Sequence, residues 1–174
     1  MDTYQVRIIG DPVLKQRARE VEEFDGTLTK ISHAMVPCMY DAGGIGLAAP
    51  QVGIQKRMFV YDLGEGEEPR TIVNPQIVET SGEDLYNEGC LSVPGMRFEI
   101  VRPAKATLHG QDLDGKEVVL EGEGLLARLF LHEVDHLDGI LLIDRLDDDQ
   151  RAEALRAIRN GALENEEPSS SSRL

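Results

Sequence analysis

The chain has 174 residues, 41% of them hydrophobic and 29% charged, which is typical of one globular domain with a substantial core. The formal net charge of −14 argues against nucleic acid as a ligand, because a polyanion would be repelled. No apolar run reaches membrane-span length and the first residues lack a signal-peptide pattern, so we expect a cytoplasmic protein that does not bind membranes.

The first two predicted helices are a short one and a long one. Residues 4–9 fit either a strand or a loop, and Asp11-Pro12 supplies an N-cap and a first-turn proline for a helix over residues 13–20. Apolar residues then recur at helical spacing over residues 25–41, and a pair of glycines follows, as is typical of a helix C-terminus.

Pro37 lies inside the second predicted helix and should kink it near His33, because proline removes one backbone hydrogen bond. We expect His33 to be exposed and Cys38 to be buried packing. In a cytoplasmic chain the two cysteines, Cys38 and Cys90, are more typical of a ligand, a nucleophile or buried filler than of a disulfide.

A glycine-rich segment, GGIGLAAPQ, follows at residues 43–51. Taken alone it fits a tight turn, and it lacks the Lys-Ser/Thr of a phosphate-binding loop. Gln51 at its end carries a neutral amide donor that suits a developing oxyanion.

The middle of the chain predicts strands. Residues 57–63 fit one strand, and residues 71–78 fit a strand, a turn and a second strand. The constrained segment EGCLSVPG, residues 88–95, then presents Cys90 either as a metal-ligating thiolate or as a buried structural cysteine. A β-hairpin with an Asp-Gly turn is expected over residues 104–121. His109 on its first strand is the rival third metal ligand, but its position near the turn and its polar neighbours favour exposure.

Residues 125–137, LLARLFLHEVDHL, predict an apolar helix that carries few polar side chains. His132 and His136 lie four residues apart, so both imidazoles project from one helix face toward a single divalent metal. Glu133 follows the first histidine and could reach a water held by that metal. Beyond this helix we expect a short apolar strand over residues 137–146.

The C-terminal part predicts an amphipathic helix over residues 148–160, with Ala152, Leu155 and Ile158 on one side. The polar, serine-rich tail, residues 164–174, has the composition of a disordered segment.

Two other functions fit an H-E-x-x-H helix. A zinc peptidase of this type usually takes its third ligand from a downstream Glu or His, whereas no His follows His136 here. A non-catalytic structural metal site usually closes all four positions with Cys and His, whereas only three such residues are candidates here.

The segments GIGLAAPQ, EGCLS and HEVDH, in this order and at these separations, together resemble the peptide deformylase family, and the resemblance extends over residues 5–160. It implies an α+β fold with antiparallel or mixed sheets packed around the central HEVDH helix, an N-terminal helix and a C-terminal helix. A single domain over residues 1–163 is expected. The implied reaction is hydrolytic removal of the formyl group from N-terminal formyl-methionine of new polypeptides by metal-bound hydroxide, with release of formate.

The resemblance also implies roles for individual residues. Cys90, His132 and His136 would bind the metal, and Glu133 would be the general acid and base. Gln51 and the backbone N–H of Leu91 would stabilise the oxyanion. The substrate-binding residues would be Ile45 and Gly46, through backbone groups, and Tyr86, Glu88, Gly89, Arg97, Leu125 and Leu129, together with His132.

The resemblance implies one divalent metal per chain, Fe²⁺ in the cell, with Zn²⁺, Ni²⁺ or Co²⁺ also accepted. It further implies formyl-methionyl nascent peptides as partners and docking at the ribosome exit region through the C-terminal helix. Three Arg against one Glu over residues 150–161 favour that docking, whereas the neighbouring acidic residues oppose it. The chain departs from the family at Leu131, where Gln is common, and at Pro37.

Overall fold

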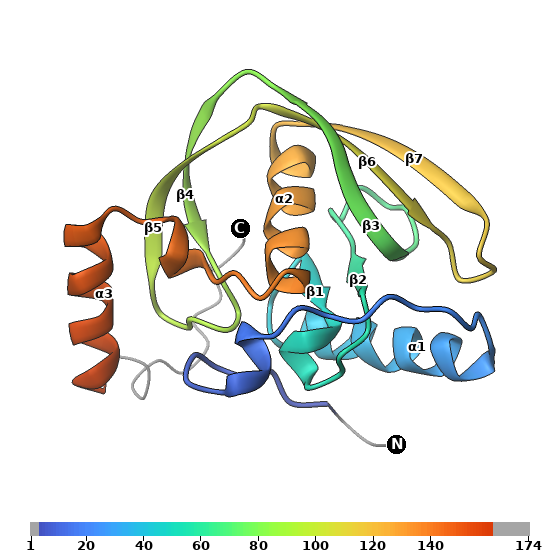
Figure 1. Ribbon diagram of the computed structural model, residues 1–174, viewed down its shortest axis with the longest axis horizontal. Coiled ribbons are helices and arrows are strands. Elements are labelled where there is room, and N and C mark those ends of the chain that lie inside the picture. Colours follow the sequence, from blue (N-terminus) through green and yellow to red (C-terminus); the bar gives the residue numbers. More distant parts are fainter. Residues whose placement is uncertain (1–3, 162–174) are drawn as a thin grey trace.

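The computed structural model describes residues 4–161, over which the chain forms three α-helices, seven β-strands and three short 3₁₀ helices (Figure 1). The α-helices are α1 (Gly26–Asp41), α2 (Leu125–Leu137) and α3 (Asp148–Arg159). The strands are β1 (Gly46–Ala48), β2 (Met58–Tyr61), β3 (Arg70–Ser81), β4 (Asp84–Gly89), β5 (Arg97–Arg102), β6 (Lys105–Gln111) and β7 (Glu117–Glu123). The 3₁₀ helices are η1 (Pro12–Lys15), η2 (Ala49–Val52) and η3 (Leu142–Arg145).

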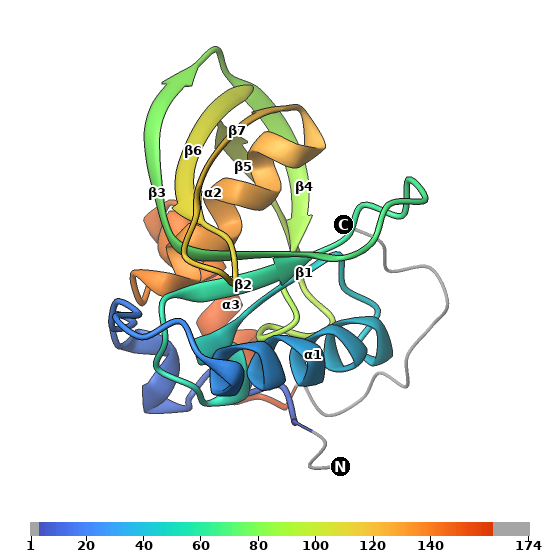
Figure 2. The ribbon, with the colours of Figure 1, turned by 90° about the vertical axis from the view of Figure 1, so that its right-hand side faces the viewer.

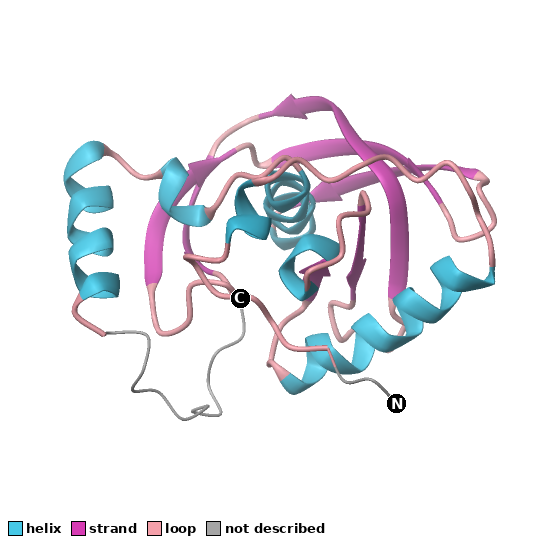
Figure 3. Cartoon of the chain, turned by 60° about the horizontal axis from the view of Figure 1, so that its bottom comes forward, coloured by secondary structure: helices cyan, strands magenta, loops and turns pink. Residues whose placement is uncertain are grey.

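The strands form two antiparallel sheets with α2 between them. The larger sheet has the order β1-β2-β3-β6-β7, and β4 pairs with β5 in a separate two-stranded ribbon. Figure 1 shows α2 in the centre of the molecule with the ribbon on one side of it, and Figure 3 shows the same helix end-on, surrounded by strands. This architecture confirms the expected α+β fold around a central helix.

Helix α2 is central because most of its side chains are buried. Phe130 packs edge-on against Tyr61 of β2, with ring centroids 5.8 Å apart. Gly122 of β7 lets the helix approach, since a Cβ there would lie 2.9 Å from the backbone nitrogen of Ala127. The sheet therefore fixes the position of the helix closely.

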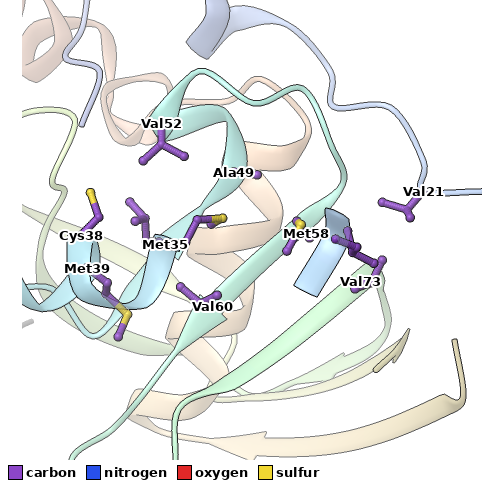
Figure 4. Packing of buried hydrophobic residues seen from close by; sticks show 11 residues of the cluster. Val21, Met35, Cys38, Met39, Ala49, Val52, Met58, Val60 and Val73 are labelled. Atoms are coloured by element: carbon purple, nitrogen blue, oxygen red, sulfur yellow. The ribbon is translucent and has the colours of Figure 1, made fainter. Parts of the chain in front are cut away.

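Helix α1 closes the core on another side (Figures 2 and 4). Asp25 caps it by accepting hydrogen bonds from the backbone N–H groups of Thr27 and Leu28. Its buried side chains, including Met35 and Cys38, pack against residues of η2, β2 and β3. The helix is continuous through Pro37, and the kink expected near His33 stays a prediction. Cys38 is buried and His33 is exposed, as expected.

The N-terminal segment, residues 4–9, is a loop that binds the two motif segments of the chain. The backbone N–H of Arg7 donates to the Gln51 carbonyl at 2.6 Å, and that of Ile9 donates to the Ser92 carbonyl at 2.8 Å. The loop thus holds the segments that contain Gln51 and Cys90 in fixed positions.

Two expectations for the first half of the chain are wrong. The helix expected over residues 13–20 is only the 3₁₀ turn η1. The backbone N–H of Ala18, beyond this turn, donates to the Leu137 carbonyl instead of to a carbonyl of the same helix. Residues 71–78 form no turn but lie within the single strand β3, where a register shift follows Val73 and Asn74 adopts a φ of 49°. The Asn74 side chain stabilises this bulge by bonding the Val21 backbone.

One expectation for the second half also needs correction. Residues 137–146 contain the 3₁₀ helix η3 rather than a strand, because the Asp144 carboxylate accepts from the backbone N–H of Leu141 and closes a turn. On α3 the buried residue is Ala154, whereas Ala152 and Leu155 are exposed. The predicted disordered tail lies outside the described residues. None of the helices over residues 4–161 combines the length and the hydropathy that a membrane crossing requires.

Candidate metal centre

Cys90, His132 and His136 converge on one point. Cys90 directly follows β4, while both histidines project from one face of α2. The Cys90 Sγ lies 3.2 Å from His136 Nε2, which lies 3.2 Å from His132 Nε2. Ligand atoms of a tetrahedral metal site with bonds of about 2.0–2.3 Å are likewise a little over 3 Å apart. The three side chains therefore fit a divalent cation, and the rival candidate His109 is exposed, as expected.

The electrostatics of the three side chains also fit a cation. Burial would raise the pKa of Cys90, but the two imidazoles outweigh it and lower the pKa to about 5. For His132 burial alone would lower the pKa, but Cys90 and Glu88 raise it well above its usual value. Metal ligands bind as a thiolate and as neutral imidazoles. A divalent cation would therefore take the place of the protons that the imidazoles carry in its absence, and its charge would stabilise the thiolate.

Glu133 lies beside the three ligand candidates in a buried position. Its side chain is 1% exposed, and its Oε2 has no hydrogen-bond partner among residues 4–161. Burial raises the pKa of Glu133 to about 7, although the two imidazoles oppose this shift. A carboxyl group with that pKa can both take up and release a proton near neutral pH.

Gly46 makes the room that Glu133 occupies. A Cβ at Gly46 would lie 2.4 Å from Glu133 Oε1, closer than real contacts allow. The Gly46→Ala change should therefore displace the Glu133 carboxylate and lower kcat about 10²-fold, as misplacement of a reacting group by about 1 Å does.

The measurement for Gly46→Ala is formate release from a formyl-methionyl peptide, alongside metal content. Gly26→Ala is the matched control, because no atom lies within 4 Å of a Cβ at Gly26. Full activity in Gly46→Ala would show that the observed position of Glu133 is not needed.

Gln51 is buried and its amide is oriented by two hydrogen bonds. Its Oε1 accepts from the backbone N–H of Ala48 at 2.9 Å, and its Nε2 donates to Ser92 Oγ at 3.1 Å. One hydrogen on Nε2 thus remains free to donate. The backbone N–H of Leu91, one residue after Cys90, makes no hydrogen bond within the described part of the chain and is a second free donor.

A chain of buried charges extends from His132. Glu88 Oε1 accepts from His132 Nδ1 at 2.6 Å, and both Glu88 oxygens accept from Arg102. Arg102 also donates to Asp135, which binds Arg145 in turn. Burial would raise the pKa of Glu88, but His132 and Arg102 lower it to about 2. Glu88 therefore stays ionised and fixes the ring of His132, as the carboxylate partners of metal-ligating histidines do.

A small, partly open cavity lies between the ligand candidates and the start of α2, and we call it the α2 cavity. It is lined by Ile45, Glu88, Leu125, Arg128, Leu129, His132 and Glu133. Of the proposed substrate-binding residues, Gly46, Tyr86, Gly89 and Arg97 are not among these lining residues. Tyr86 instead stacks on Arg128, and Arg97 donates to the Asn87 carbonyl while pairing with Gly89 across the ribbon.

The sequence reasoning gave no role to Ser92, Arg102, Arg128 and Asp135. A signal existed for Asp135 and Arg128, because a charged residue on an otherwise apolar helix needs a buried partner or a ligand. Ser92 and Arg102 gave no such signal, since their roles depend on contacts between segments distant in the chain.

Comparisons with known proteins all point to one family. Residues 3–152 match the family model described as Polypeptide deformylase. A peptide deformylase of Halothermothrix orenii is 49% identical over 146 residues, which cover 84% of this chain and 95% of that protein. One of Carboxydothermus hydrogenoformans is 48% identical over 84% of this chain and 95% of that protein. The crystal structure of a peptide deformylase from Legionella pneumophila has a TM-score of 0.88 and 40% identity, covering 96% of this chain and 100% of that chain.

Proposed function

The chain belongs to the polypeptide deformylase family, and we propose that Cys90, His132 and His136 bind the metal on which these hydrolases depend. Its activity is the hydrolytic removal of the formyl group from the N-terminus of newly synthesised peptides. The observation that supports the proposed ligand set is the convergence of one sulfur and two ring nitrogens beside the buried Glu133.

The proposed mechanism assigns the proton transfers to Glu133. The metal, when bound, supplies Lewis acidity that makes a hydroxide nucleophile available near neutral pH. Glu133 takes up the proton of the attacking water and returns it to the nitrogen that leaves with the peptide. Its burial keeps bulk water from competing as the proton acceptor.

The same mechanism assigns oxyanion stabilisation to two donors. As hydroxide adds to the formyl carbon, negative charge develops on the carbonyl oxygen. The free hydrogen on Gln51 Nε2 and the N–H of Leu91 are available to donate to that oxygen. Because Ala48 and Ser92 already orient the Gln51 amide, little reorganisation is needed during the reaction.

Substrate binding is assigned to the outer edge of β1 and to the α2 cavity. Strand β1 pairs only with β2 in the described sheet, so its other edge is free. The Ile45 carbonyl faces β2, because it accepts from the backbone N–H of Asp62. Backbone groups alternate in an antiparallel pair, so those of Gly46 face the free edge and can bind an extended peptide. The apolar walls Ile45, Leu125 and Leu129 suit the methionine side chain.

We propose Fe²⁺ as the metal in the cell, with Zn²⁺, Ni²⁺ or Co²⁺ as replacements. One thiolate and two imidazoles form a donor set of the borderline-soft kind that binds these ions. Metal analysis after anaerobic purification tests this proposal. Iron near one atom per chain, with loss of activity in air, is the expected result, and stable zinc in cell-grown protein would contradict it.

We also propose that the enzyme acts in the cytoplasm, docked near the ribosome exit through α3. Support comes from Arg156 and Arg159, which are exposed and form no ion pair within residues 4–161, whereas Arg151 pairs with Asp144. Deleting residues 148–174 should remove co-sedimentation with ribosomes. Unchanged co-sedimentation of the deletion variant would rule out α3 as the docking element.

The activity itself is tested by release of formate from formyl-Met-Ala-Ser by the metal-loaded protein. Stoichiometric formate and free Met-Ala-Ser are expected. Cleavage between Met and Ala without formate would instead indicate a peptidase.

A further inference from the structure

Arg128 is a buried cation on the wall of the α2 cavity for which residues 4–161 provide no hydrogen-bond or ion-pair partner. Its side chain lines the cavity, and the whole residue is 8% exposed. The other two buried arginines of the described residues differ, since Arg57 binds Asp138 and Arg102 binds Glu88 and Asp135. Arg128 makes one specific contact, with its Cζ 4.1 Å from the centroid of the Tyr86 ring.

That contact positions the guanidinium without using its donors. A ring beneath a guanidinium contacts its face, while the N–H groups point outward in the guanidinium plane. Glu88, an acid in the cavity wall, already accepts from His132 and from Arg102. Burial lowers the pKa of Arg128, yet a guanidinium remains protonated at neutral pH. The N–H donors of Arg128 are thus available to a ligand in the cavity.

We propose that Arg128 is a specificity-determining residue whose N–H donors bind the far end of the substrate's first side chain. This inference depends on the proposed function, which places that side chain in the α2 cavity. The enzyme then discriminates among N-terminal residues of the substrate by the hydrogen-bond acceptor at the end of their side chains. Norleucine has none, the methionine thioether is a weak acceptor, and the oxygen of methionine sulfoxide is a strong one. Oxidised formyl-methionine is therefore a substrate that an entirely apolar pocket would reject.

The test compares kcat/KM for three peptides, formyl-X-Ala-Ser, in which X is norleucine, methionine or methionine sulfoxide. In the parent enzyme the sulfoxide peptide should be processed faster than the norleucine peptide. Arg128→Leu should lower the sulfoxide-to-norleucine ratio by about 10–100-fold, the loss expected for a hydrogen bond to a charged group. The change should appear in KM, because the bond exists before and during the reaction.

Each ratio is measured on one preparation, so the fraction of folded, metal-loaded enzyme cancels. Arg19→Leu, at an exposed position before α1, is the control and should keep the parent ratio. Tyr86→Leu, which removes the ring beneath the guanidinium, should lower the ratio in the same direction as Arg128→Leu. An unchanged ratio in Arg128→Leu, or a parent enzyme that prefers norleucine, would overturn the assignment. Absence of formate from all three peptides would reject the proposed function instead.

Discussion

Glu133→Gln should retain the metal and lose deformylation, with kcat falling at least about 10²–10⁴-fold, the usual contribution of a general acid–base group. Glutamine has nearly the same size and keeps one carbonyl oxygen, so the packing against Gly46 is preserved. What it loses is the ability to take up a proton from water and return it to the leaving nitrogen. The loss should therefore appear in kcat rather than in KM.

The measurement is formate release from formyl-Met-Ala-Ser, with metal content and peptide binding determined on the same preparation. The matched control is Glu153→Gln on α3, which makes the same chemical change at an exposed position and should leave kcat unchanged. Substantial turnover by Glu133→Gln would remove this residue from the proton transfers and leave the buried carboxylate without a role.

Cys90→Ala should lose the metal on dialysis, and activity should be lost with it. Two imidazoles from one helical turn remain, but the thiolate supplies the negative charge of the ligand set. Changes to groups that merely orient metal ligands typically cost 10–100-fold in affinity, and loss of a direct ligand should cost more.

The second cysteine provides the control. Cys38 is buried in the core beneath α1, in a different hydrophobic cluster from Cys90, and its thiol donates to the Tyr4 carbonyl at 3.4 Å. Cys38→Ala should lower the free energy of unfolding by creating a small cavity but keep the metal. Equal metal content in Cys90→Ala and the parent would show that the third ligand lies elsewhere.

Features set by local pattern could be predicted from the sequence. Helix α2 spans the predicted residues 125–137, because its apolar residues and its ends are encoded within the segment itself. The Asp-Gly hairpin between β6 and β7 and the helix predicted over residues 25–41 are confirmed for the same reason. The position of Cys90 next to His136 is different, since it depends on how the β4–β5 ribbon folds over α2.

Predictions failed where contacts between distant segments outweigh local preference. The segment after η1 has a helical pattern, yet its backbone forms hydrogen bonds with Leu137 and with the residues just before β2 instead. Asn74-Pro75 has the composition of a turn, yet its neighbours in β2 and β6 keep β3 continuous. The buried charges of Arg102 and Asp135 follow the same rule, because each residue acquires its partner only when the ribbon meets α2.

The most direct test of the proposed metal centre is X-ray absorption spectroscopy at the metal edge of the anaerobically purified enzyme. A shell with one sulfur at about 2.3 Å and two imidazole nitrogens at about 2.0–2.1 Å is expected if Cys90, His132 and His136 bind the ion. A shell made only of nitrogen and oxygen atoms would contradict the assignment of Cys90 and the mechanism that depends on it.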